Sequence, residues 1–138
     1  MGLDNYICIR EKKTHKHLSV KDVLDRDYYK SYSPMLGEFV CYWRKFWGFR
    51  DEVIEEVLKN RHSVVILSLE DLIEILIVLE KYTEVSYYED KNVNQIWSWR
   101  EYLLQIVKTI ANLRLLIDDI AEGRIDLNEY EVIWVDSY

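Results

Sequence analysis

The feature that most restricts the fold is the position of two strand-like segments, one near each end of the chain. Residues 6–9 read Tyr-Ile-Cys-Ile, and residues 130–135 read Tyr-Glu-Val-Ile-Trp-Val. Both combine β-branched and aromatic side chains, which favour strands, and the second also alternates. Between them, the strongest apolar patterns have the three- and four-residue spacing of amphipathic helices. Terminal strands with helices between them predict one small sheet in which the two strands pair.

Three main helices are expected between these strands. Apolar residues at helical spacing place the first over residues 37–58, with a bend at Gly48. The second runs from about residue 69 to residue 82, and the third from about residue 94 to residue 122. Residues 64–67, Val-Val-Ile-Leu, form either a short strand or the approach to the second helix. The predicted fold class is therefore helix-rich α+β, with three main helices and a small sheet formed by the N- and C-terminal strands.

Helix boundaries have local signals. Ser19 is followed three residues later by Asp22, and Ser68 by Asp71, so both serines resemble the start of a capping box in which Asp replaces the usual Glu. Gly123 suits the residue that follows the last turn of a helix. These signals predict helix starts after Ser19 and Ser68 and a helix end before Gly123.

Length and composition indicate one globular domain over residues 1–138. Hydrophobic residues make up 49% of the chain and charged residues 31%, and there are only four glycines and one proline. The apolar run at residues 75–79 is too short to span a bilayer, and the N-terminus lacks the pattern of a signal peptide. The two cysteines form no C-x-x-C pair, which favours a reducing compartment and hence the cytoplasm.

The net charge is −7 and is unevenly distributed along the chain. The first 50 residues contain ten Lys and Arg against six Asp and Glu, whereas the remainder contains eight against nineteen. Nucleic-acid binding requires many cations to neutralise phosphates, so the overall acidity makes it an unexpected function. A basic patch near the N-terminal half is compatible with this asymmetry.

A cluster of tryptophan and arginine residues is the leading candidate site. On the expected first helix, Trp43, Trp47 and Arg50 share one broad face, and Arg44 lies beside them. An arginine on an apolar face needs an anionic or carbonyl partner. Either Arg44 or Arg50 binds an anionic ligand beside a stacking tryptophan, or internal carboxylates pair with the arginines and the tryptophans fill the core.

Trp99 and Arg100 form a second candidate group, close to the start of the long helix. Trp97 and Trp99 are two residues apart and cannot share one helical face. One of them is therefore expected at a contact surface, unless both pack against the sheet while Arg100 extends to solvent. The second helix is apolar on most of its circumference, so it is either buried on more than one side or pairs with another chain as a homodimer.

No spacing indicates catalysis or a metal site. His15 and His17 lie among lysines that would repel a cation, and Cys41 on an apolar segment is more typical of a small core residue than of a nucleophile. Phosphate loops, nucleophile elbows and dinucleotide fingerprints are all absent from the sequence. We therefore expect a non-enzymatic protein with no cofactor, no metal and no catalytic residue.

Three segments together resemble a group of small, uncharacterised phage and prophage proteins. They are the start, Met-Gly-Leu-Asp-Asn-Tyr, the internal Tyr-Trp-Arg-Lys at residues 42–45, and the aromatic C-terminal segment. Asn5 stands where the group has Met, and the Ala-Asn-x-Ile-His-x-Trp continuation after the internal motif is missing. The resemblance implies an accessory protein of a phage or prophage. Such a protein is expected to bind a host protein in the bacterial cytoplasm, with inhibition of host defence as one outcome. The alternative expectation is a small-ligand protein that holds a nucleotide-like anion in the tryptophan and arginine cluster.

Overall fold

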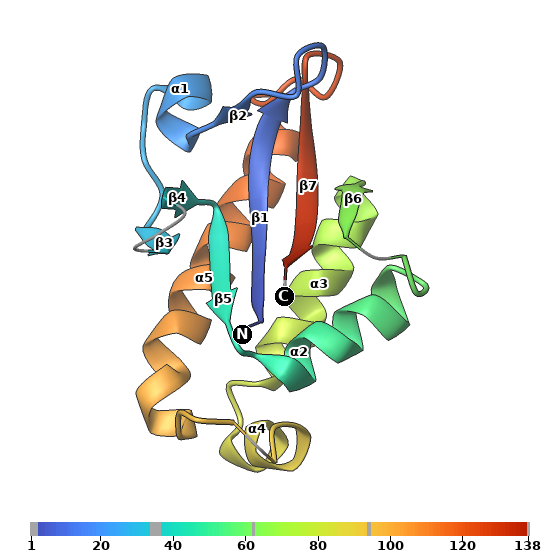
Figure 1. Cartoon of the computed structure of the whole chain (residues 1–138). Helices are drawn as coiled ribbons and strands as arrows, with labels where there is room; N and C mark the ends of the chain where they lie inside the picture. The colour runs from blue at the N-terminus through green and yellow to red at the C-terminus, as the bar shows by residue number, and fades with distance from the viewer. Residues whose placement is uncertain (1–2, 34–36, 62, 94, 138) are drawn as a thin grey trace.

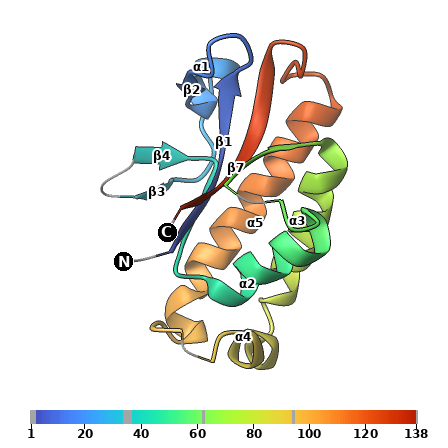
Figure 2. The same cartoon turned by 45° about the vertical axis from the view of Figure 1, so that its right-hand side comes forward.

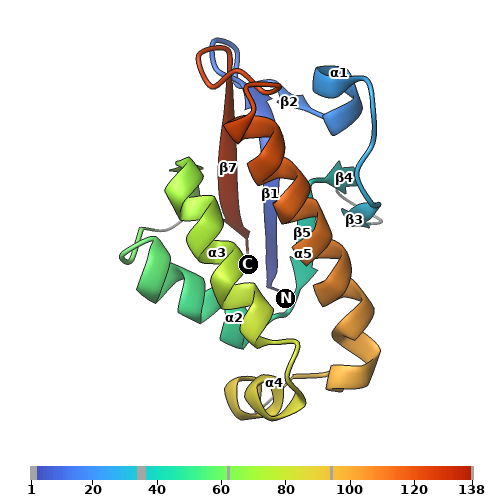
Figure 3. The ribbon, with the colours of Figure 1, turned by 180° about the vertical axis from the view of Figure 1, so that it is seen from behind.

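The chain folds as an antiparallel sheet with its two longest helices on one face. The computed structural model describes residues 3–33, 37–61, 63–93 and 95–137. Figure 1 views the sheet from its outer face, and Figure 3 shows α3 (Leu69–Lys81) and α5 (Trp99–Ala121) crossing the opposite face. This arrangement confirms the predicted helix-rich α+β class.

The two terminal strands form the centre of the sheet. β1 (Asp4–Glu11) and β7 (Tyr130–Ser137) pair antiparallel along their whole length, from Asp4 opposite Ser137 to Glu11 opposite Tyr130. On the far side of β7 lies β6 (Val64–Leu67), so residues 64–67 form a strand. The predicted pairing of the N- and C-terminal segments is therefore confirmed.

The other side of β1 is shared by two short strands. β5 (Cys41–Arg44) pairs with its first half, and β2 (His17–Leu18) pairs with its second half. A separate hairpin of β3 (Ser31–Ser33) and β4 (Gly37–Phe39) stands out from the outer face, as Figure 2 shows.

The first predicted helix is wrong in its N-terminal half. Residues 37–44 form β4 and β5, and helix α2 (Trp47–Glu52) begins only after Lys45, whose φ of 53° breaks the chain direction. A turn of π-helix, η1 (Val53–Val57), continues α2. Cys41, Tyr42 and Trp43 are consecutive and all buried. A strand that is buried on both faces does not show the alternation of apolar and polar residues that identifies a strand. The apolar residues of β5 therefore also matched the spacing of a helix.

The other helices follow the local signals more closely. Ser19 and Ser68 both complete capping boxes, at α1 (Val20–Leu24) and at α3, as predicted. α5 ends at Ala121, and Gly123 adopts a left-handed φ of 78°, as expected after a helix end. The expected start of the third helix at Asn94 lies outside the described residues. α5 begins at Trp99, with Ser98 as its N-cap.

One helix lies in a segment for which none was expected. α4 (Val85–Lys91) follows α3 after a short turn and packs below α2 (Figure 1). The core between the sheet and the helices is unusually aromatic. Trp43, Phe46, Phe49 and Trp134 are fully buried and contact one another, and Tyr82 and Tyr102 extend this cluster toward α4.

The predicted second helix, α3, is buried on one face and exposes apolar side chains on the opposite face. In α3, Leu72, Ile75 and Leu79 are fully buried, whereas Ile73 and Ile77 are exposed.

None of the helices in the described part of the chain is long and apolar enough to cross a membrane.

Candidate functional site

The structure distributes the predicted tryptophan and arginine cluster over several environments. Trp43 lies in the core with no exposed surface. Its indole Nε1 donates to Oγ1 of Thr109 on α5 at 3.0 Å, and its ring contacts Phe49 and Trp134. A buried indole with its N–H bonded is the usual state of a core tryptophan. The position of Trp43 therefore matches the alternative in which it fills the core.

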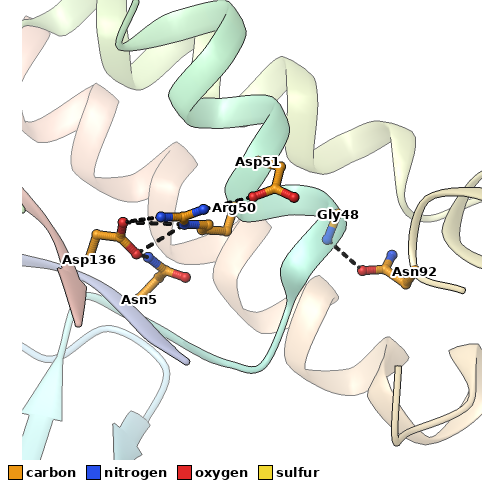
Figure 4. A network of polar contacts seen from close by, with 6 residues as sticks. All are labelled: Asn5, Gly48, Arg50, Asp51, Asn92 and Asp136. Atoms are coloured by element: carbon orange, nitrogen blue, oxygen red, sulfur yellow. Dashed lines mark hydrogen bonds and ion pairs between the residues drawn. The ribbon is translucent and has the colours of Figure 1, made fainter. Parts of the chain in front are cut away.

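Arg50 is held in a network of carboxylates and amides below the sheet. Its Nη2 lies 2.7 Å from Oδ2 of Asp136, and its Nε lies 3.2 Å from each oxygen of that carboxylate. Asp51 contacts the other guanidinium nitrogen at 2.8 Å, and Asn5 donates its side-chain N–H to Asp136 at 2.7 Å. Figure 4 shows Arg50 and Asn5 meeting at the Asp136 carboxylate, with Asp51 on the other side of the guanidinium. The Asp136 side chain is only 1% exposed, so Arg50 provides the charge that a buried carboxylate requires.

Trp47, Trp99 and Arg100 lie on the surface or at its boundary. Trp47 is 40% exposed on α2 and lines a shallow hollow with Lys91 and Gln95. Trp99 is half-buried and donates its indole N–H to the Tyr82 carbonyl at 3.2 Å, while Arg100 is exposed. The six predicted residues are therefore divided between the core, an ion-pair network and separate surface positions.

Arg44 lies at the mouth of a small groove beside β5. The groove has a volume of about 180 Å³ and is lined by Tyr42, Arg44, Trp97, Glu101, Tyr102 and Gln105. The main-chain N–H of Arg44 donates to the Tyr102 hydroxyl at 3.1 Å, which fixes the backbone against α5. The Arg44 side chain is exposed and forms no ion pair with any residue that the structure describes. The groove thus combines an available guanidinium with aromatic walls.

A row of aromatic rings continues from this groove across the outer face of the sheet. Tyr6 on β1 stacks on Phe39 of β4, with ring centroids 4.1 Å apart, and Phe39 also stacks on Tyr42 at 6.1 Å. The Tyr42 hydroxyl donates to Asp4 at 2.5 Å. Tyr6 and Phe39 are half-buried and remain accessible on the side away from α3 and α5. We call Tyr6, Phe39, Tyr42 and Arg44 the outer aromatic row.

The outer face ends at β6 in exposed aliphatic side chains. Val64 and Ile66 are 50% and 54% exposed, and they lie opposite Val135 and Ile133 of β7. Val65 and Leu67 are buried on the other face. The alternation of exposed and buried residues is visible only once the strand is known, because all four residues are apolar. Arg44 was predicted from the sequence as a site residue, whereas Tyr6, Phe39, Tyr42 and the exposed edge of β6 were not.

The buried cysteines are poorly suited to nucleophilic chemistry. Burial raises the pKa of the Cys41 thiol well above its usual value, and the thiol contacts the Thr109 carbonyl at 3.6 Å. Burial also raises the pKa of Cys8 to about 12, an effect that the charge of Arg10 only partly opposes. Both thiols therefore stay protonated at neutral pH, whereas the thiolate is the reactive form. Among the described residues, no group of three or more His, Cys, Asp or Glu is arranged to hold a metal ion.

Asp119 forms a second buried carboxylate network, at the upper end of α5. Its side chain has no exposed surface and accepts hydrogen bonds from Arg26, Tyr28 and Arg124. Burial by itself would raise the pKa of Asp119, but the hydrogen bonds from Tyr28 and Arg124 and the nearby arginine charges outweigh it and lower the pKa. This network joins the loop after α1 to the end of α5.

Protein families, curated proteins and solved structures yield no significant match to this chain.

Proposed function

We propose that this protein is a non-enzymatic accessory protein of a phage or prophage that binds a host protein through the outer aromatic row. It acts in the cytoplasm of the bacterial host, and inhibition of a host defence system is the outcome that we favour. The resemblance of the chain to phage and prophage proteins supports the origin. The observation that carries the binding site is the row of stacked rings ending at Arg44 on the sheet face away from α3 and α5.

The chemistry of this row is that of an interaction surface. Energetic hot spots in protein interfaces are rich in Tyr, Trp and Arg, and they are surrounded by contacts that exclude water. Stacking already orders the rings of Tyr6 and Phe39. These side chains would therefore lose little conformational entropy when a partner binds. Arg44 can form a bidentate pair with a carboxylate of the partner. A partner with an acidic residue beside an apolar patch fits this arrangement.

The proposal is tested by capture from host lysate with matched arginine variants. Tagged wild-type protein is expected to recover one stoichiometric host protein. Arg44→Glu should reduce its recovery at least tenfold, because a hot-spot truncation changes binding by about 1.4 kcal/mol or more. Arg100→Glu makes the same charge change at an exposed position on α5 and should leave recovery unchanged. Circular dichroism of both variants establishes that each is folded.

Two results would contradict the proposal. One is that no host protein is recovered in stoichiometric amount when the resin is saturated with the tagged wild-type protein. The other is a partner that Arg100→Glu loses and Arg44→Glu retains, since such a partner would contact the helical face instead.

A second candidate function is the binding of a small nucleotide-like anion in the groove beside β5. It is favoured by the exposed guanidinium of Arg44, which stands next to Trp97 and Tyr102 with no described ion-pair partner. The groove, at about 180 Å³, is smaller than a typical ligand pocket of about 300 Å³ or more, so one phosphate or one ring would be enclosed at a time. Arg50 and Trp43 have no part in this site, because one is paired with Asp136 and the other is buried.

Calorimetry with linear and cyclic nucleotides separates this candidate from the first. Binding heat that disappears in Arg44→Ala would support it. Titrations without heat for any nucleotide would remove it and leave the protein-binding proposal unaffected.

A further inference from the structure

β6 presents main-chain hydrogen-bonding groups on the edge away from β7. The N–H of Asp136 donates to the carbonyl of Ser63 at 2.8 Å. This bond shows which residues of β6 have their main-chain groups directed toward β7. In an antiparallel ladder, alternate residues bond to the same neighbour. Val65 and Leu67 therefore bond to β7, while the N–H and C=O groups of Val64 and Ile66 point to the open edge.

Apart from the short length of β6, this edge lacks the features that usually prevent strand pairing. Native edges are commonly protected by charged residues, proline, bulges or very short strands. Residues 63–68 read Ser-Val-Val-Ile-Leu-Ser, without a charge or a proline. A shallow hollow lined by Arg61, Val64, Val65 and Ile66 runs beside the strand. The opposite edge of the sheet, by contrast, is divided between the short strands β2 and β5.

We propose that a second copy of this chain pairs with β6 through a two-fold axis, so that two β6 strands join two sheets into one. The partner's Ile66 then lies opposite Val64, and the partner's Val64 lies opposite Ile66, with the axis at Val65. In this register the outward groups of Val64 and Ile66 form four hydrogen bonds across the axis. All side chains keep their faces, because paired residues differ by an even number of positions.

The neighbouring register is less favourable. With the axis at Ile66, Val64 would need the main-chain groups of the partner's Ser68. Those groups are already used at the start of α3, since the Ser68 N–H donates to Asp71 and the Ser68 carbonyl accepts from Leu72. That register leaves two hydrogen bonds in place of four, which selects the axis at Val65.

Charge at the two ends of β6 favours a second copy over an unrelated strand. Lys59 precedes the strand and Glu70 follows it, and both are exposed, whereas Arg61 already lies 3.9 Å from Asp71 of its own chain. Antiparallel pairing brings Lys59 of each copy toward Glu70 of the other, twice in one dimer. This local attraction opposes the repulsion between two chains that each carry a net charge of −7.

The dimer would also extend the proposed binding surface. A two-fold axis perpendicular to the sheet leaves both outer faces on the same side, and so it places two outer aromatic rows on one continuous sheet. The inference itself does not rest on the proposed function, because it concerns the protein alone and is measured without a host partner.

The test is the association state of the full chain and of two matched variants. Because β6 has only four residues, the joint is small and the dimer should be weak, so sedimentation equilibrium should extend to about 300 µM. The wild type is expected to be a reversible dimer in this range. Ile66→Lys should raise the dissociation constant at least tenfold. Ile77→Lys is the control, because Ile77 on α3 is 53% exposed and Ile66 is 54% exposed.

Hydrogen exchange adds a readout at the strand itself. The amides of Val64 and Ile66 should exchange rapidly at low protein concentration and slow markedly as concentration rises, while the Val65 amide is slow throughout. A wild-type monomer at 300 µM would overturn the proposal. So would a dimer that Ile77→Lys dissociates and Ile66→Lys does not, since that result assigns the contact to α3. The proposal would also be overturned if a dimer forms but the amide hydrogen exchange of Val64 and Ile66 does not slow.

Discussion

At the scale of single residues, two buried carboxylates connect segments that are distant in the sequence. Asp136 binds Arg50, 86 residues earlier, and Asp119 binds Arg26, 93 residues earlier. A buried carboxylate is stable only when charges and donors surround it, and both sites meet this condition with arginine and a second donor. Arg50, which the sequence placed on an apolar face, thus has its anionic partner on β7.

The buried Asp119 leads to a prediction of how the stability of the protein changes at acid pH. Asp119→Asn should lower the free energy of unfolding at pH 7 by about 2 kcal/mol, the typical size of a lost hydrogen bond to a charged group. The native pKa of Asp119 is lowered, so the unfolded state takes up its proton first as pH falls. The stabilisation is therefore complete above about pH 4 and is lost as pH falls through the lower native pKa.

The measurement is urea unfolding of wild type and variant between pH 7 and pH 2. The difference between the two proteins should shrink below about pH 4, near the unfolded pKa of Asp. Asp118→Asn, at the exposed neighbouring position on α5, is the control and should show little difference at any pH. A constant difference for Asp119→Asn over the whole range would contradict the assigned lowering of its pKa.

At the scale of elements, serine caps set the start of the helices that cover the sheet. The Ser68 hydroxyl accepts from the Asp71 N–H at 3.1 Å, and the Asp71 carboxylate accepts from the Ser68 N–H at 3.0 Å. Two main-chain donors without helical partners are thereby satisfied. The same arrangement opens α1, and the Ser98 hydroxyl accepts from Glu101 at the start of α5.

Removing the α3 cap should weaken the whole domain, since α3 packs into the core. Ser68→Ala is expected to lower the free energy of unfolding by about 1 kcal/mol, because the orphan N–H of Asp71 loses its acceptor. Thermal unfolding followed by circular dichroism measures the change. Ser86→Ala places the same substitution inside α4 at an exposed position and should not destabilise the protein. Equal stability of the two variants would count against a role for the cap.

At the scale of the whole molecule, the fold is closed by its two ends. β7 is the only described strand that pairs with both β1 and β6, and its Trp134 and Val132 lie fully buried in the core. β1 and β7 share more contacts than any other described pair of elements. The sheet therefore depends on β7, which joins β1 to β6.

A chain that ends before Tyr130 should not fold, because β6 loses its partner and the core loses Trp134. The expected NMR spectrum has little amide dispersion. Adding a synthetic peptide of residues 128–138 should restore dispersion, whereas a peptide of the same composition in scrambled order should not. A well-dispersed spectrum from the truncated chain alone would show that the helices and β1 suffice.

The sequence by itself determined the fold class, the pairing of the terminal strands, the caps at Ser19 and Ser68 and the helix end before Gly123. These depend on local chemistry, namely β-branched and aromatic runs and short-range hydrogen bonds. The tertiary structure decided that residues 37–44 are strands, that Arg50 pairs with Asp136, and that Arg44 and the edge of β6 face solvent. Each of these is set by contacts between segments far apart in the chain, and periodicity cannot distinguish a doubly buried strand such as β5 from a helix.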